Sequence, residues 1–183
     1  MNHPIAFATL VEYWFGELEP QDEQRLEEHL LDCSDCSERL GELAQLGAGI
    51  SAAFRRGELR AVISPALLAK MKSEGLRLRE YRVSPGEAAQ CTIGAEDDAV
   101  VGRLQAPLAG VTRIDLVRLD AAGQVRLRLP DIPFDPAAGE VLFCPSAARL
   151  KKEPAHTDTV RLIAVDESGE RALGDYTFMH TPS

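Results

Sequence analysis

The chain has 183 residues, of which 45% are hydrophobic and 27% charged; this composition is typical of a folded globular protein of one or two domains and excludes a disordered chain. The net charge of −9 lies entirely in residues 1–42, which hold eleven acidic and two basic side chains, whereas the rest of the chain is balanced. A segment this acidic repels phosphate backbones, so it is not expected to bind DNA or RNA directly.

The first 75 residues predict helices. Pro4 can occupy the first turn of a helix whose rough apolar face continues until Gly16 breaks the run. A second helix is expected to begin at Pro20, because Asp22 and Glu23 favour the positive end of a helix dipole. The buried face of this second helix would carry Leu26, His29, Leu30 and Cys33.

Two more helices are predicted further along this region. Ser37 is a candidate cap for a third helix, whose apolar residues recur at spacings of three and four and are expected to form core. This stripe comprises Leu40, Leu43, Leu46, Ile50 and Phe54. Ser64 and Pro65 predict the start of a fourth helix, which should stop near Gly75.

After Gly75 the apolar period changes from about 3.6 to two, which indicates strands. The segments 120–123 and 166–170 have the composition of hairpin turns. The expected strands are 76–83, 100–104, 113–119, 124–129, 140–143, 160–165 and 171–179. We therefore predict an α+β protein of two domains, with a helical bundle over residues 1–75 and an all-β sandwich or small barrel over residues 76–183.

No targeting signal is expected. No Lys or Arg precedes Arg25, and the longest uncharged stretch, 43–54, is shorter than the ~20 apolar residues of a membrane span. The sequence therefore predicts a cytoplasmic protein without a membrane partner. Thiols stay reduced in that compartment, where a close cysteine pair favours a metal or redox site over a structural disulfide.

The strongest local motif is His29-Leu-Leu-Asp-Cys33-Ser-Asp-Cys36. His29 and Cys33 are four residues apart, so on a helix they share one face, and a turn can bring the Cys36 sulfur beside that of Cys33. An imidazole and two thiolates are ligands that tetrahedral zinc prefers. His3 is the best candidate for a fourth ligand, because antiparallel first and second helices would return it to the end of the second.

Zinc would also explain how so small a bundle stays folded, since 40 to 50 residues bury little apolar surface. Four protein ligands leave no open position for water, so the site is expected to be structural or regulatory. Two alternatives are a core histidine and a thioredoxin-type dithiol, although the dithiol would be expected after a strand and at a helix start. Four residues of the other half are poorer ligand candidates: Cys91, Cys144, His156 and His180.

The run from His3 through the segment 13–20 to His29-x3-Cys33-x2-Cys36 resembles the zinc-containing anti-sigma factor domain. The resemblance covers roughly the first 45 residues and implies a small zinc-bound helical bundle with His3, His29, Cys33 and Cys36 as ligands. It further implies a bacterial regulator that inserts between the two domains of an extracytoplasmic-function sigma factor and prevents its docking on RNA polymerase. An acidic module suits the basic faces of such a partner.

Two departures from the family pattern matter. Redox-switching members have Cys at the first ligand position, where this chain has His3. The simple thiol switch of those members is therefore in doubt for this chain. A disulfide between Cys33 and Cys36, or one that involves Cys91, remains chemically open. Members with His at that position can carry a metal-binding cupin, but the clustered histidines of a cupin are missing. His156 and His180 are expected to be ordinary strand or loop residues, and the β domain to be a sensor or stabilising domain of unknown input.

The sequence therefore predicts a cytoplasmic zinc-binding anti-sigma factor, involved in a stress response, that sequesters its partner until a signal releases it. The sequence does not identify the signal, and an oxidative signal is one option. It also leaves open the sigma partner and the oligomeric state. The alternative is a zinc-containing transcriptional regulator that binds nucleic acid itself. An enzyme is not expected, because no GxSxG, HExxH, P-loop or Rossmann fingerprint occurs.

Overall fold

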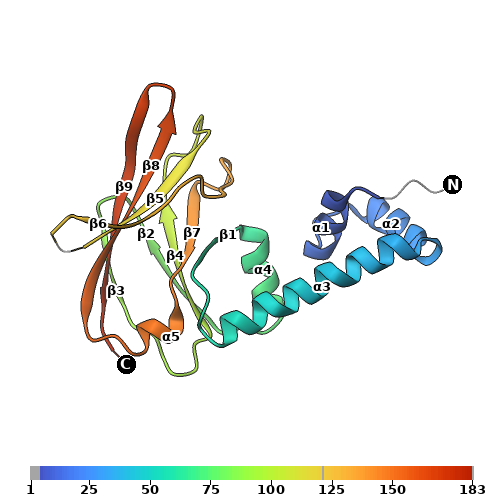
Figure 1. Cartoon of the computed structure of the whole chain (residues 1–183), viewed down its shortest axis with the longest axis horizontal. Coiled ribbons are helices and arrows are strands. Elements are labelled where there is room, and N and C mark those ends of the chain that lie inside the picture. The colour runs from blue at the N-terminus through green and yellow to red at the C-terminus, as the bar shows by residue number, and fades with distance from the viewer. Residues whose placement is uncertain (1–4, 121, 183) are drawn as a thin grey trace. The chain divides into compact units, whose positions relative to one another are not determined.

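The computed structural model describes residues 5–120 and 122–182, and the chain divides into two compact units, Met1–Ala52 and Ala53–Ser183 (Figure 1). The first unit contains the helices α1 (Phe7–Phe15), α2 (Pro20–Asp32) and most of α3 (Ser34–Arg55). The second unit is built mainly of strands. The predicted order, helices followed by a two-sheet β region, is confirmed.

The ends of α1 and α2 follow from local chemistry. Gly16 has a φ of +73°, a left-handed conformation that glycine adopts without strain, and it ends α1 where the sequence predicts. Pro20 occupies the first turn of α2, where its missing N–H costs nothing. Asp22 and Glu23 lie in that same turn, at the positive end of the helix dipole.

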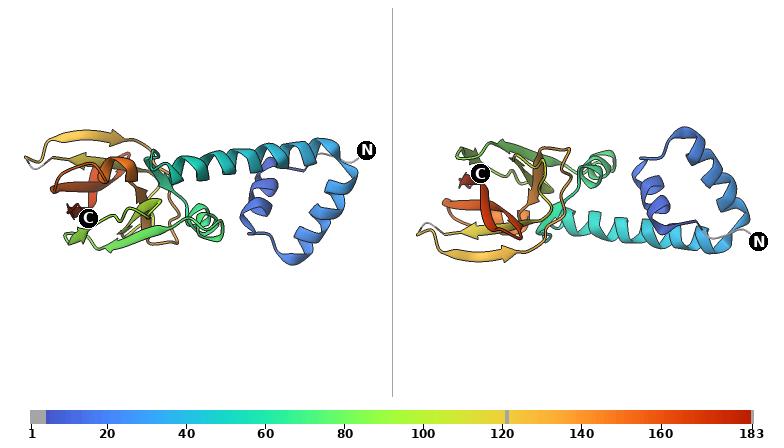
Figure 2. Two further views of the ribbon diagram at one scale, coloured as in Figure 1. Left: turned by 90° about the horizontal axis from the view of Figure 1, so that it is seen from below. Right: turned by 90° about the horizontal axis from the view of Figure 1, so that it is seen from above.

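Packing between α1 and α3 explains a glycine inside a helix. A Cβ placed on Gly47 would lie 2.1 Å from Cζ2 of the Trp14 indole, so the two helices meet where α3 has no side chain. Glycine in a helix interior costs roughly 0.5–1 kcal/mol relative to alanine. The close approach of Trp14 explains why glycine occupies this position despite its cost to helix stability. Figure 2 shows α1, α2 and α3 following one another from the N-terminus.

Helix α3 begins at Ser34, earlier than expected. The N–H of Ser37 donates to the carbonyl oxygen of Cys33, which makes Cys33 the flanking residue and places Ser37 inside the first turn. The prediction that Ser37 caps this helix is therefore wrong. Of the leucine stripe, Leu43 and Phe54 are buried whereas Leu46 is 60% exposed. None of the helices in the described residues is long and apolar enough to cross a membrane.

Helix α4 (Pro65–Ser73) confirms the predicted fourth helix, and the Ser64 hydroxyl accepts a hydrogen bond from the Leu67 N–H as its cap. The division between the compact units, however, falls at residues 52 and 53, whereas the sequence analysis places a boundary at 75 and 76. The reason is that α4 buries Leu68 and Met71 within the second unit.

Two β-sheets form the sandwich of the second unit. In the described residues, one sheet has the order β1-β7-β4-β2 and the other the order β3-β9-β8-β5-β6. Most neighbours are antiparallel, but β2 pairs with β4 and β3 pairs with β9 in parallel. The strands and the remaining short helix are β1 (Ala61–Ile63), β2 (Leu78–Val83), β3 (Ala88–Cys91), β4 (Ala99–Gln105), β5 (Ile114–Leu119), β6 (Val125–Leu129), β7 (Glu140–Cys144), α5 (Ala147–Leu150), β8 (His156–Asp166) and β9 (Gly169–His180).

The core lies between the two sheets. Leu104 and Phe143 from one sheet pack in the same buried cluster as Leu116 and Leu162 from the other. Tyr176 is fully buried, and its hydroxyl donates to the carbonyl oxygen of Gln105 at 2.6 Å, which ties β9 to the end of β4. This hydrogen bond satisfies a phenol that would otherwise be costly to bury.

Both predicted hairpins are confirmed. The carboxylate of Asp120 accepts hydrogen bonds from the backbone N–H groups of Ala122 and Gln124, and Gly123 has a φ of +74°. The strands β8 and β9 join at Gly169, with a φ of +124°. The sequence analysis missed the short elements β1, β3 and α5, which have four residues or fewer each.

The buried thiol of Cys144 predicts a loss of stability at alkaline pH. Burial raises the pKa of Cys144 from 9.0 to about 12. The folded protein therefore retains the thiol proton at a pH where the unfolded chain releases it. The contribution of this thiol to the free energy of unfolding is complete below pH 9 and is lost as pH rises towards 12. Between about pH 8 and about pH 10.5, urea titrations should show that Cys144 lowers the free energy of unfolding by about 2 kcal/mol.

The matched variant is Cys144→Ala, in which this part of the pH dependence should disappear. Tyr176, whose pKa burial also raises to about 12, remains in both proteins and acts above pH 10. An identical loss of stability in the two proteins over this interval would contradict the assignment.

Candidate metal centre

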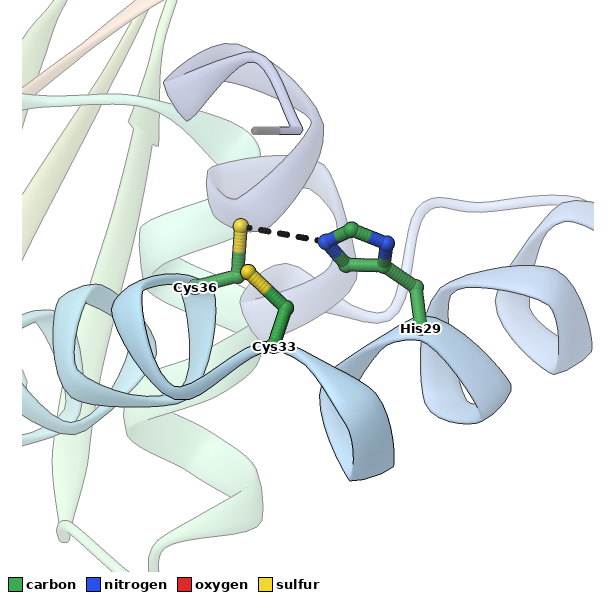
Figure 3. A group of neighbouring side chains, drawn as sticks. All are labelled: His29, Cys33 and Cys36. Atoms are coloured by element: carbon green, nitrogen blue, oxygen red, sulfur yellow. Dashed lines mark hydrogen bonds between the residues drawn. The ribbon is translucent and has the colours of Figure 1, made fainter. Parts of the chain in front are cut away.

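Three side chains meet where α2 gives way to α3 (Figure 3). His29 lies in the last turn of α2, Cys33 is the single residue between the helices, and Cys36 lies in the first turn of α3. One ligand atom from each of the three residues lies within 4.8 Å of the other two. The spacing of three and two residues in the sequence thus becomes a cluster in space, as the motif predicts.

The cluster is partly shielded from water. The Nε2 atom of His29 lies 3.3 Å from Sγ of Cys36, the contact that Figure 3 marks with a dashed line. Cys36 is fully buried, whereas His29 and Cys33 are half-buried, and both thiols are free rather than joined as a disulfide.

The N-terminal segment lies against the same cluster. The backbone N–H of Ile5 donates to Sγ of Cys36 at 3.3 Å. The guanidinium of Arg39, one turn further along α3, donates to the carbonyl oxygen of Ile5 at 3.2 Å and lies over the ring of Phe7. Groups around a metal site commonly donate hydrogen bonds to the atoms that bind the metal, as this backbone N–H does to the cysteine sulfur.

Ser37 stabilises the junction that holds the two cysteines in place. Its hydroxyl lies 2.7 Å from the carbonyl oxygen of Leu30 and 3.2 Å from that of Cys33. The carbonyl of Leu30 is one of the last four of α2, which have no partner within that helix, and Cys33 is the residue that flanks it. Ser37 therefore fixes the turn between His29 and Cys36, a role that differs from the cap expected from the sequence.

Negative charge surrounds the site. Exposed carboxylates lie along α2. The hydroxyl of Tyr13 donates a hydrogen bond to Oε1 of one of them, Glu27, at 3.3 Å. Burial and the charge of Glu27 raise the pKa of Tyr13. This surface would attract cations and basic protein faces and repel nucleic acid.

The donor set fits a metal ion of borderline or soft character. Two sulfurs and an imidazole suit zinc better than calcium or magnesium, which prefer oxygen. In the part of the chain that the structure describes, this is the one group of three or more such side chains already gathered closely enough to bind an ion. His3, the predicted fourth ligand, lies outside the described residues.

Comparison with known proteins bears on this segment. Residues 8–37 match a family model described as "Putative zinc-finger". The match spans α1, α2 and the start of α3, and it contains His29, Cys33 and Cys36 but not His3. The resemblance of the N-terminal unit to the HxxxCxxC zinc-finger domain typical of anti-sigma factors is thereby confirmed over these residues. A search of curated proteins found no match.

Solved structures were compared with the whole chain. The N-terminal domain of phage TP901-1 ORF48 aligns over 57% of this chain and 98% of its own length, with 9% identity and a TM-score of 0.37. CopC from Methylosinus trichosporium OB3b aligns over 68% of this chain and 95% of its own length, with 12% identity and a TM-score of 0.28. Similarity this low supports no functional argument.

Proposed function

From the HxxxCxxC zinc-finger domain in its N-terminal unit, we propose that the protein is a zinc-binding anti-sigma factor. In this proposal it sequesters an extracytoplasmic-function sigma factor in the cytoplasm and prevents its binding to RNA polymerase. The observation that carries the proposal is the gathering of His29, Cys33 and Cys36 within a segment that matches the zinc-finger family. The protein acts by binding rather than by catalysis.

His3 completes the proposed zinc site. Ile5, two residues after His3 in the sequence, donates its backbone N–H to the sulfur of Cys36, which supports a further ligand from the N-terminal segment. Zinc bound by His3, His29, Cys33 and Cys36 would link the N-terminal segment, α2 and α3. The four protein ligands leave no position for a reactive water, which agrees with a structural or regulatory role.

The surface of the N-terminal unit supports a protein partner. Its net negative charge complements the basic faces of a sigma factor and would speed their association. Three large apolar side chains of this unit are exposed and can add binding energy at such an interface: Phe7 at 50%, Leu31 at 87% and Leu46 at 60%.

A reconstituted transcription assay tests the proposal. The zinc-loaded full chain should suppress transcription from a promoter that depends on the partner sigma factor, and added core polymerase should relieve the suppression by competition. Transcription driven by the primary sigma factor is the control and should not change. Tight DNA binding by the chain alone at low salt, without sigma binding, would instead support the nucleic-acid-binding alternative.

Leu31 offers a test of the proposed contact surface. Leu31→Ala should weaken the complex about tenfold, equivalent to about 1.4 kcal/mol, because it removes apolar area that the partner would cover. Titration calorimetry with the zinc-loaded proteins measures the change. Val125→Ala, which truncates a 61% exposed side chain on β6, is the matched control and should bind normally. Equal affinities for the two variants would exclude Leu31 from the interface.

A further inference from the structure

We propose a second metal site in the β-sandwich, in which Cys91, His156 and His180 bind one borderline or soft d-block ion such as Zn²⁺ or Cu⁺. This site lies wholly within the second unit and does not depend on the proposed function of the first. From the sequence, these histidines are expected to be ordinary strand or loop residues, because they are 24 residues apart and no third ligand adjoins them.

The sheet register places the three residues in one row. Cys91 on β3 pairs with His180 on β9, and His180 pairs in turn with His156 on β8. Directly paired residues on neighbouring strands project from the same face of a sheet, about 4.8 Å apart across the strands. The imidazole rings of His156 and His180 have centroids 5.1 Å apart. A thiol and two imidazoles from three strands therefore face one space.

His180 carries the clearest sign of a missing partner. Its side chain is only 3% exposed, and its Nε2 atom is buried without a hydrogen-bond partner among the described residues. Leaving a polar atom buried and unpaired is costly, so such an atom in a native fold calls for a bound group. A metal ion on Nε2 would satisfy it.

His156 is oriented as metal-binding histidines commonly are. Its Nδ1 lies 2.9 Å from the carbonyl oxygen of Pro154, a backbone acceptor of the kind that orients metal-binding histidines through their other nitrogen. Nε2 in turn faces the carboxylates of Glu153 at 3.4 Å and Asp158 at 3.5 Å. Both carboxylates have arginine partners as well, Arg149 for Glu153 and Arg118 for Asp158, so they add negative charge beside Nε2 that is compatible with a bound cation.

The same side chains line a small cavity between the sheets. The cavity has a volume of about 40 Å³, and its lining includes Cys91, His156, Asp158 and His180, with the rings of Phe143 and Phe178 among the apolar walls. That volume suits an ion with one or two small ligands, since a water needs about 10–15 Å³. Organic ligands usually occupy cavities of about 300 Å³ or more.

Binding requires small side-chain movements. The ligand atoms of this row are not already gathered as those of His29, Cys33 and Cys36 are, so χ rotations must bring them onto the ion. Cys91 would coordinate as a thiolate, and its proton would pass to solvent as the metal–sulfur bond forms. Soft and borderline ions are favoured over Mg²⁺ or Ca²⁺ because the set offers sulfur and two imidazoles.

Zn²⁺ titrations of the full-length chain test the site, with a chromophoric chelator as competitor. Cys91→Ser and His156→Ala should each bind one equivalent of Zn²⁺ less than the unchanged protein. Cys144→Ser, which alters another buried thiol of the same unit, should lose none. Cys33→Ser should lose the equivalent of Zn²⁺ that the N-terminal cluster binds, which Cys91→Ser and His156→Ala both retain. Loss of zinc from the N-terminal cluster is therefore distinguishable from loss of zinc from the β-sandwich.

The His156 variant keeps the test decisive if changes at buried positions disturb folding, since the His156 side chain is 24% exposed and its replacement by alanine leaves the core intact. Circular dichroism checks that Cys91→Ser, His156→Ala and Cys144→Ser are folded. Unchanged zinc content in both Cys91→Ser and His156→Ala would overturn the proposal. An equal loss in Cys144→Ser would overturn it as well.

Discussion

Cys33→Ser is expected to abolish zinc binding by the N-terminal unit and to unfold its helices. Among the described residues of this unit, the buried hydrophobic side chains are limited to Leu10, Leu26, Cys36 and Leu43, a core too small to offset the entropy of ordering about 50 residues. A structural zinc ion contributes on the order of 10 kcal/mol in small domains. Its loss should therefore remove most of the α-helical circular dichroism of residues 7–52.

Cys33 is the informative position because it is half-buried, so serine costs little packing and the effect reports coordination. Cys144→Ser controls for the loss of a thiol and should retain the zinc of the N-terminal unit and its helical signal. Zinc analysis together with the helical signal at 222 nm, a conventional wavelength for helix content, measures both quantities. A variant that keeps its helices without zinc would contradict a metal-dependent fold.

Asp115→Ala should produce the largest loss of stability in the β-sandwich, about 3 kcal/mol. Asp115 is 1% exposed and accepts hydrogen bonds from Arg128 Nε at 2.8 Å, from Arg113 Nε at 3.2 Å and from the backbone N–H of Asp131 at 3.0 Å. Burial opposes ionisation, but these donors hold the pKa of Asp115 below its usual value. Alanine would remove the acceptor of the Asp131 N–H and of Arg113, whereas Arg128 would keep its second acceptor, Glu170.

Urea unfolding of the full chain, followed through a signal of the β-sheets, measures this loss. Glu58→Ala is the matched control, because it breaks an ion pair with Arg56 in which both side chains are more than half exposed. Such surface pairs contribute at most about 1 kcal/mol. Equal destabilisation by the two substitutions would show that the Asp115 cluster does not anchor the sandwich.

The metal cluster was predictable because its chemistry is local. His29, Cys33 and Cys36 are close in sequence, and helical spacing together with the turn between α2 and α3 brings their side chains together. The ends of α1 and α4 were predictable for the same reason, since Gly16 and Ser64 act on their own turns. Local spacing was less reliable at Ser37, whose hydroxyl reaches back to α2 rather than capping α3.

Features that depend on strand order could not be predicted. The parallel pairs β2–β4 and β3–β9 join segments whose sequence separation gives no register. Nothing in the sequence indicated that β3, a strand of four residues, would place Cys91 beside His180. The row formed by Cys91, His180 and His156 therefore arises only in the tertiary structure. Helix α4 lies in the second unit, with Leu68 and Met71 buried, which its own helical pattern does not indicate.

We propose that zinc, held at the junction of α2 and α3, maintains the surface that captures a sigma factor. The affinity of the full chain for that sigma factor, measured before chelation, after chelation and after zinc is restored, tests this directly. Binding is expected to be lost with the metal and to return with it. Unchanged affinity in the metal-free protein would contradict it.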